Sequence, residues 1–289
     1  MEPLVSVLLP CRNGQRTVGA AIASLLDQTL ENFEIIFLND GSTDSTLQIV
    51  QAFKDPRIRV CGDTSGRGLP YRLNEGVRLA RGQFIARMDA DDLCFPSRLQ
   101  KQVDFLTNNQ SVDLVGCRAV VFRDDGSVIG LLPFAATHLE ICARTWRNIP
   151  LPHPSWMGRR EWFIKNPYRI PEVHRAEDQE LLLRTCNYST FACMDDVLLA
   201  YRQGDFQLRR TLVARRALWL VQIRHFWAQR AHLSWVRSTA ISLVKVAIDC
   251  LAALPGLQRI FFFRMHANVP EKLAADFAAR FAQCSAGSA

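Results

Sequence analysis

The stretch Phe84-Ile85-Ala86-Arg87-Met88-Asp89-Ala90-Asp91-Asp92 decides the fold of this chain. Its first half is a short apolar run with β character, preceded by Gly82, which predicts a buried strand that ends at a turn. Asp89, Asp91 and Asp92 then bring three carboxylates into four positions. Like charges this close raise one another's pKa unless a cation lies among them, and Mg²⁺ or Mn²⁺ prefers such oxygen ligands. The alternative is an acidic loop that caps the next helix.

Further apolar runs lie on the N-terminal side of this stretch, separated by turn residues and helical patterns. The expected strands cover residues 4–10, 33–38 and 57–61, and the expected helices cover residues 17–30, 44–53 and 70–80. This alternation predicts an α/β domain with a mostly parallel sheet and right-handed crossovers. Because ligands of such sheets bind beyond the carboxyl ends of the strands, the acids at 89–92 should lie at a binding site.

The pattern changes on the C-terminal side of the stretch. The sequence predicts helices over 97–108 and 138–147, strands over 112–115, 119–122 and 128–132, and a proline-rich loop at 150–154. A clear amphipathic helix follows at 176–186, with Leu181, Leu182 and Thr185 on its inner face. Glu177 and Asp178 occupy its first turn, where acids also suit the helix dipole without any catalytic role.

Several classes of protein are excluded by what the sequence lacks. It has no G-x-G-x-x-G after the first strand and no G-x-x-x-x-G-K-[ST], which argues against a dehydrogenase-type dinucleotide fold and a P-loop ATPase. Its nine cysteines form no C-x-x-C pair, so we expect reduced thiols in the cytosol rather than disulfides or a zinc site. Residues 1–3 run directly into the first strand, so no signal peptide is expected.

Four motifs occur in a fixed order: V-S-V-L-L-P-C-R-N-G, L-N-D-G-S-T-D-S-T, G-x-F-I-A-R-M-D-A-D-D and A-E-D-Q-E-L-L-L-R. Together they resemble the family 2 glycosyltransferases of the GT-A fold, over residues 4–202. The resemblance implies one Rossmann-like nucleotide-binding domain over residues 1–205, with a mostly parallel central sheet flanked by helices. Its nucleotide-sugar half would cover residues 1–110 and its acceptor half residues 111–205.

The resemblance also implies a reaction: metal-assisted, inverting transfer from a nucleotide-diphosphate sugar to a glycan or lipid-linked acceptor in cell-surface polysaccharide biosynthesis. Residue by residue, it places Pro10 and Arg12 beside the base and ribose, Asp40 on the base, Asn74 facing the nucleotide, Asp89 on the ribose side, Asp91 on the metal, and Asp178 as the catalytic base. Asp40 favours a uridine donor.

The chemistry agrees with these roles. A divalent metal, Mn²⁺ or Mg²⁺, neutralises the charge that grows on a departing diphosphate. The acceptor hydroxyl has a high pKa, so an aligned carboxylate must take its proton as attack proceeds. One base without a covalent nucleophile gives a single in-line displacement and therefore inversion.

For each of the other candidate site residues, the sequence allows either a contact with a ligand or a purely structural role. Arg72 would reach the diphosphate or be an exposed helix arginine, and His153 would contact acceptor or diphosphate or lie tucked into its loop. Trp156 would stack on a sugar or pack in the core, and Glu177 would contact the acceptor or only suit the helix dipole. Asp44 and Asp92 are expected to cap helices or support the site. The Q-x-x-R-W motif of processive relatives is incomplete at residues 207–211, which favours a non-processive enzyme.

Residues 206–289 are expected to form a basic, amphipathic helical region, with helices over 211–235 and 239–254 and a short helix within 267–289. Residues 201–266 carry eleven Lys and Arg but two acids, a local charge of +9 against +7 for the whole chain. Lys245 and Asp249 interrupt the apolar run, so no transmembrane helix is expected. Aromatics between Arg259 and Arg264 and the basic helices favour peripheral contact of residues 211–266 with the anionic inner face of the cytoplasmic membrane. The alternative is packing on the catalytic domain or on a second subunit of a homodimer.

Two rival functions remain. A sugar-nucleotide nucleotidyltransferase would carry a glycine-rich, basic loop after the first strand, whereas this loop has one glycine and Arg12. A catalytically degenerate nucleotide-binding protein or a nucleic-acid binder would not need the acids at 40, 89, 91 and 178, which repel phosphates unless a metal intervenes. We therefore expect no nucleic-acid partner.

Overall fold

The computed structural model describes residues 2–171, 175–254, 256–257 and 268–286. Its centre is one nine-stranded sheet in the order β3-β2-β1-β4-β8-β6-β9-β5, with β7 paired to the C-terminal end of β6. The strands are β1 Val5–Cys11, β2 Phe33–Asp40, β3 Ile58–Asp63, β4 Phe84–Arg87, β5 Leu93–Cys94, β6 Leu114–Phe122, β7 Val128–Leu131, β8 Met157–Arg159 and β9 Phe191–Arg202.

The sheet is mostly parallel, as expected. Its three longest ladders, β1–β2, β2–β3 and β6–β9, are all parallel, and β1 also pairs in parallel with β4. The antiparallel ladders of β4 with β8, β5 with β9, and β6 with β7 and β8 are short. β1 therefore lies between β2 and β4, with the carboxyl ends of all three strands at one edge of the sheet.

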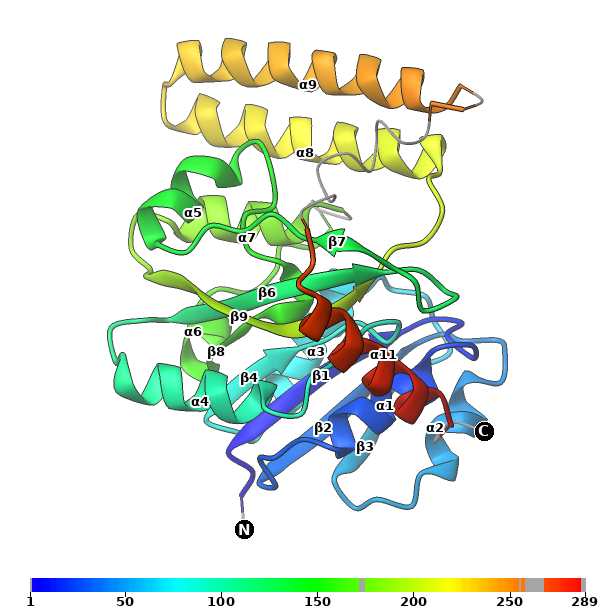
Figure 1. Ribbon diagram of the computed structural model, residues 1–289. Coiled ribbons are helices and arrows are strands. Elements are labelled where there is room, and N and C mark those ends of the chain that lie inside the picture. Colours follow the sequence, from blue (N-terminus) through cyan, green and yellow to red (C-terminus); the bar gives the residue numbers. More distant parts are fainter. Residues whose placement is uncertain (1, 172–174, 255, 258–267, 287–289) are drawn as a thin grey trace.

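Helices cover both faces of the sheet (Figure 1). One core lies under α1 Val18–Leu26, α2 Thr46–Ala52 and α4 Arg98–Asn108, and the other under α3 Leu69–Leu79, α5 His138–Thr145, α6 Arg160–Lys165 and α7 Glu177–Thr185. Side chains of β1 alternate between them, because Val7 and Leu9 join the first core and Leu8 joins the second. The α/β architecture expected from the sequence is confirmed.

The acceptor half departs from the expected elements. The two strands expected over 112–115 and 119–122 are one strand, β6, which begins at Leu114, while β8, β9 and α6 were not predicted. β9 could not be predicted from the sequence because the exposed Asp195 and Asp196 interrupt its apolar pattern. At this point the pairing with β6 shifts register, so two residues bulge out of the ladder.

The C-terminal helices fall into two groups (Figure 1). α8 Leu208–Ala228 and α9 His232–Ala252 form a hairpin beyond α5 and α7, with α9 outermost. The helix expected over 211–235 is interrupted. Arg230 has a left-handed conformation, with φ of 55°, so α8 ends before this residue and α9 begins after it. α11 Glu271–Ala286 returns to the catalytic half: Phe277 and Cys284 join a core with Leu93 and Phe122. Among the described residues, no helix has both the length and the apolarity needed to cross a bilayer.

Candidate active site

The carboxyl ends of β1, β2 and β4 bring the first three sequence motifs together. Leu8 of β1 pairs with Ile36 of β2 and Arg87 of β4, so Pro10, Asp40 and the loop after Arg87 emerge at the same edge. A strand order that reverses at β1 leaves a crevice at this edge, where open α/β sheets bind their ligands.

Asp40 is a buried carboxylate that organises the loop after β3. Its Oδ1 accepts hydrogen bonds from the backbone N–H groups of Arg67 and Gly68 and from Arg72 Nε, at 2.8, 3.1 and 3.0 Å. Its Oδ2 accepts only from Gly68 N–H, at 3.1 Å, among the described residues. Since a carboxylate oxygen has two lone pairs, Oδ2 retains capacity to accept a hydrogen bond from a ligand.

Arg72 is neither an exposed helix arginine nor free to reach a diphosphate. Its completely buried guanidinium donates to Asp40, to Asp63 and to Glu75. Because Asp63 and Glu75 hold the guanidinium in place, Arg72 in turn fixes the orientation of the Asp40 carboxylate. Arg72 thus positions the Asp40 carboxylate, which differs from both alternatives drawn from the sequence.

Arg12 lies across Gly66 in the same loop. A Cβ added at Gly66 would come within 2.5 Å of Arg12 Nη1, so a larger residue there would displace the Arg12 side chain. The loop after β1 is also tied to the loop after β2, since Asn13 N–H donates to Ser42 and Gly14 N–H donates to Thr46. Asp44 accepts from the N–H of Thr46, the first residue of α2, at 3.0 Å, although Ser45 and not Asp44 occupies the N-cap position.

Asp89, Asp91 and Asp92 form a cluster whose carboxylate ligand atoms lie within 4.8 Å of one another. Desolvation by the surrounding protein, and after it the charge of Asp89, raises the pKa of Asp91 to about 6. The pKa of Asp92 is also raised, first by burial and then by the charge of Asp91. Asp92 Oδ2 is buried and has no partner among the described residues. These oxygen donors fit a hard divalent cation, which would offset their repulsion.

Arg202, at the end of β9, holds this acidic loop in place. Its backbone N–H donates to Asp92 Oδ1 at 2.8 Å, and its Nε donates to the carbonyl oxygen of Asp91 at 2.7 Å. Its guanidinium also pairs with Asp124 at 3.1 Å. Sequence reasoning missed Arg202, because the contact joins positions 110 residues apart across an unpredicted strand.

Asp178 and Glu177 begin α7, after Ala176 in a left-handed conformation with φ of 62°. Asp178 is 6% exposed, and its Oδ1 accepts from the N–H of Gln179 at 2.8 Å. Burial raises the pKa of Asp178, and burial with the charge of Asp178 raises the pKa of Glu177 to about 7. Carboxylates with raised pKa values are suited to taking up a proton near neutral pH.

His153 lies beside this pair in the loop before β8. Its Nε2 is 2.8 Å from the Tyr168 hydroxyl, and its Nδ1 is 4.0 Å from Glu177 Oε1. Burial lowers the pKa of His153 well below its usual value, and the charge of Arg87 lowers it further, so the imidazole is neutral. His153 therefore lies buried between Tyr168, its hydrogen-bond partner, and Glu177.

Arg87 is the cation between the two acidic groups. It is 3% exposed, and its Nη2 donates to Asp89 Oδ1 at 2.5 Å. It also lies within electrostatic range of Glu177 and Asp178 and lowers the pKa of both. Its buried Nε and Nη1 have no hydrogen-bond partner among the described residues. No sequence motif marked Arg87 as more than part of a strand.

Asn74 and Trp156 make their hydrogen bonds within the protein. The Asn74 side chain donates to the carbonyl oxygen of Tyr168 at 2.8 Å and accepts from its N–H at 2.9 Å, which pins this segment against α3. Trp156 is completely buried, and its indole N–H donates to the carbonyl oxygen of Leu151 at 3.1 Å. With no accessible ring face, Trp156 follows the core alternative rather than stacking on a sugar.

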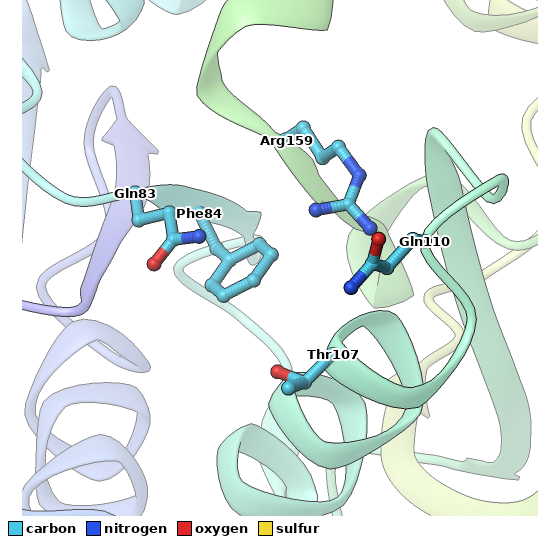
Figure 2. A pocket seen from close by; sticks show the side chains of 5 residues that line it. All are labelled: Gln83, Phe84, Thr107, Gln110 and Arg159. Atoms are coloured by element: carbon cyan, nitrogen blue, oxygen red, sulfur yellow. The ribbon is translucent and has the colours of Figure 1, made fainter.

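A hollow of about 390 Å³ lies at the opposite edge of the sheet (Figure 2). Gln83 and Phe84 line it at the start of β4, together with Thr107, Gln110 and Arg159. The Arg159 guanidinium donates to carbonyl oxygens of Leu106 and Val112, at 2.8 and 3.2 Å, and so satisfies the end of α4. We assign no ligand to this hollow, since its cation is already paired.

Comparison with known proteins agrees with this geometry. The family model described as "Glycosyl transferase family 2" matches residues 6–166, which include the strand ends, the acidic cluster and His153. The chain belongs to glycosyl transferase family 2. By family it is a glycosyltransferase, which decides against the nucleotidyltransferase alternative. Asp178 and Arg202 lie beyond the matched residues.

Curated relatives of this family 2 chain cover different shares of it. The putative glycosyltransferase EpsE of Bacillus subtilis is 35% identical over 63% of the chain, and the match covers 66% of EpsE. The Escherichia coli UDP-Glc:alpha-D-GlcNAc-diphosphoundecaprenol beta-1,3-glucosyltransferase WfgD is 28% identical over 66% of the chain, and the match covers 74% of WfgD.

Solved structures of low sequence identity share the fold of this family 2 chain. Staphylococcus aureus TarS 1-349 in complex with UDP has a TM-score of 0.59 and 20% identity, covering 87% of this chain and 71% of that one. The mannosyltransferase PcManGT from Pyrobaculum calidifontis, in complex with GDP-Man and Mn²⁺, has a TM-score of 0.59 and 16% identity, covering 99% and 87%. The fold is therefore of the GT-A type.

Proposed function

We propose that this chain is an inverting, non-processive glycosyltransferase that moves one sugar from a UDP-sugar to a hydroxyl of a glycan or lipid-linked acceptor in cell-surface polysaccharide biosynthesis. One observation carries the proposal. Two groups of carboxylates from distant segments, at 89–92 and at 177–178, lie at one edge of the sheet with Arg87 between them. Two carboxylate sites with separate duties are what such a transfer requires.

Asp178 is the proposed general base. It takes the proton from the acceptor hydroxyl while the hydroxyl oxygen forms a bond to the anomeric carbon of the donor sugar. The bond from that carbon to the diphosphate oxygen breaks in the same step, and the nucleoside diphosphate leaves with the electron pair. A single displacement inverts the anomeric centre. Arg87 keeps the base ionised in its buried position.

Asp91, with Asp89 beside it, is proposed to hold Mn²⁺ or Mg²⁺. A bound divalent cation would neutralise the charge that develops on the diphosphate. The close packing of these acids, the raised pKa of Asp91 and the unpartnered Asp92 Oδ2 support a cation here. Asp89 is assigned to the ribose side, where its pairing with Arg87 fixes its orientation.

A uridine donor is favoured by Asp40, whose Oδ2 can accept from the N–H of a uracil ring. Pro10 and Arg12 would line the same nucleotide pocket. The UDP complex of TarS and the UDP-Glc in the name of WfgD are consistent with this donor. WfgD also supports a lipid-linked acceptor, because its name gives diphosphoundecaprenol as the carrier.

We place the reaction at the inner face of the cytoplasmic membrane, with residues 211–266 in peripheral contact with anionic lipid. Nine free cysteines are consistent with a reducing compartment. The basic α8–α9 region supports contact with an acidic surface.

Calorimetric titration of the full chain with UDP, GDP and dTDP, with and without Mn²⁺, tests the proposal. We expect metal-dependent binding of UDP and much weaker binding of the other two. Retention of a UDP-sugar without turnover, in the presence of a panel of lipid-linked acceptors, would contradict the proposed transfer. Binding of none of the nucleotides would contradict the nucleotide site itself.

A further inference from the structure

α9 is an amphipathic helix whose polar side faces the protein and whose apolar side faces solvent. Its buried residues are Ser238, Asp249 and Ala252, two of them polar. From residue 240 to residue 254, every exposed residue is Ala, Val, Leu, Ile or Cys. A surface helix of a globular protein normally presents its apolar stripe to the core and its polar face to water.

Polar contacts with α8 hold α9 in this orientation. Asp249 accepts from Arg215 Nε and Nη2 at 2.8 and 3.3 Å, and Ser242 donates to Gln222 at 3.2 Å. Trp219 donates to Thr239 at 3.2 Å. Since buried polar groups need partners, rotating α9 to hide its apolar face would break each of these bonds. The outward apolar face is therefore built into the hairpin.

The outward face is large. It carries six well-exposed aliphatic side chains, and the most exposed, Leu233, keeps 88% of its surface in contact with solvent. They are Leu233, Val236, Leu243, Val244, Leu251 and Leu254. Figure 1 shows α9 as the outermost layer on this side, with no described element beyond it. Exposed apolar side chains gathered on one helix are typical of an interaction site.

The charges beside this face identify its partner. Residues 208–254 contain eight Lys and Arg and a single acid, Asp249, which is buried and paired. The exposed side of α8 carries Arg209, Arg216 and Arg224. A second copy of the chain would bring the same arginines against each other, whereas anionic headgroups complement them.

We propose that the outer face of α9 inserts into the interfacial layer of an anionic lipid bilayer while the α8 arginines contact the headgroups. Such helices lie in the plane of the interface and bind through apolar area and charge together. α8 packs on the catalytic domain through Val221, which meets Leu183 of α7, and through Phe226, whose ring meets that of Trp146. Docking therefore places α7, which begins with the proposed base, on the membrane-facing side of the catalytic domain, with α8 and α9 between it and the bilayer. Delivery of a lipid-linked acceptor to Asp178 rests on the proposed function; the docking surface does not.

Flotation of the full chain with vesicles of phosphatidylcholine, alone or mixed with phosphatidylglycerol, tests this surface. We expect binding to the anionic vesicles that weakens at high salt. The double variant Leu243→Gln/Leu251→Gln should bind about tenfold more weakly, as should Arg216→Gln/Arg224→Gln. Leu139→Gln, at an exposed leucine of α5, is the matched control and should bind like the unaltered chain.

UDP titration of the same variants separates docking from catalysis, because none of these residues lies at the nucleotide site. Failure of the unaltered chain to float, or normal flotation of the Leu243→Gln/Leu251→Gln variant, would overturn the docking proposal whatever the UDP result. Light scattering that shows a dimer which this variant converts to monomers would overturn it in favour of a second copy. Vesicle binding without UDP binding would instead overturn the proposed function alone.

Discussion

Arg72 Nε donates to Asp40 Oδ1 across 3.0 Å from a completely buried guanidinium. The same guanidinium contacts Asp63 and Glu75, so one planar cation serves three carboxylates. Lysine is a point charge and cannot reproduce this fork of donors. The carboxylate that we propose to recognise the base therefore depends on a residue that we do not expect to touch the nucleotide.

Arg72→Lys should weaken UDP binding by about tenfold, because loosening Asp40 misplaces the carboxylate that meets the base. Calorimetric titration in Mn²⁺ measures the change. Arg78→Lys, at an exposed position of the same helix, is the control and should bind UDP normally. Unchanged affinity in Arg72→Lys would show that Asp40 holds its orientation without the buried arginine.

Asp178→Asn should leave UDP binding nearly intact and reduce transfer by about 10²- to 10⁴-fold, the usual contribution of a general base. The amide keeps the size of the side chain but cannot take up the acceptor proton. Initial rates and UDP titration on the same preparation separate the two effects. Asp195→Asn, at an exposed acid of β9, serves as control. Parallel loss of binding and transfer would refute the assignment of Asp178 as base.

Arg87→Gln should move the acidic limb of the pH profile of kcat/KM to higher pH. The positive charge of Arg87 lowers the pKa of Asp178 and Glu177, so its removal raises both pKa values. The base must be ionised to act, and a higher pKa means that it is ionised only at higher pH. Rates measured from acidic to alkaline pH test this shift, with Arg78→Gln as control. A lower rate with an unmoved limb would assign Arg87 a purely structural role.

Asp91→Ala should remove the increase in UDP affinity that Mn²⁺ produces, because the most exposed carboxylate of the cluster is lost. Titrations with and without Mn²⁺ give this increment directly. Asp104→Ala, on the exposed side of α4, should keep the full increment. If Asp91→Ala also kept it, the cation would be held by other groups.

The strands and acids of the nucleotide half were predictable because each motif joins an apolar run to polar residues at its end. Chain order alone then brings Pro10, Asp40 and Asp89 to one edge. The supporting contacts were not predictable in the same way. Arg202 reaches Asp92 from a strand whose pattern is broken by two acids, and Arg87 reads as an ordinary strand residue until its burial is known.

The C-terminal region shows a second limit. Its basic, amphipathic composition was visible in the sequence, and so was the interruption of the apolar run by Lys245 and Asp249. Which side of the helix faces the protein was not, because periodicity gives the angle between two faces but not their orientation. The partners that decide it, Arg215 and Gln222, lie one helix earlier.

The return of α11 to the catalytic half has a consequence for biosynthesis. Arg280 donates to the carbonyl oxygens of Cys94 and Ser24, and Phe277 fills the core beside Leu93 and Phe122. The ribosome makes these residues after the whole α8–α9 hairpin. Until α11 emerges, the nascent chain exposes this apolar surface next to its acidic loop. The last part of the catalytic half therefore folds only when α11 has been made. Before then, the exposed surface can bind chaperones or lead to aggregation.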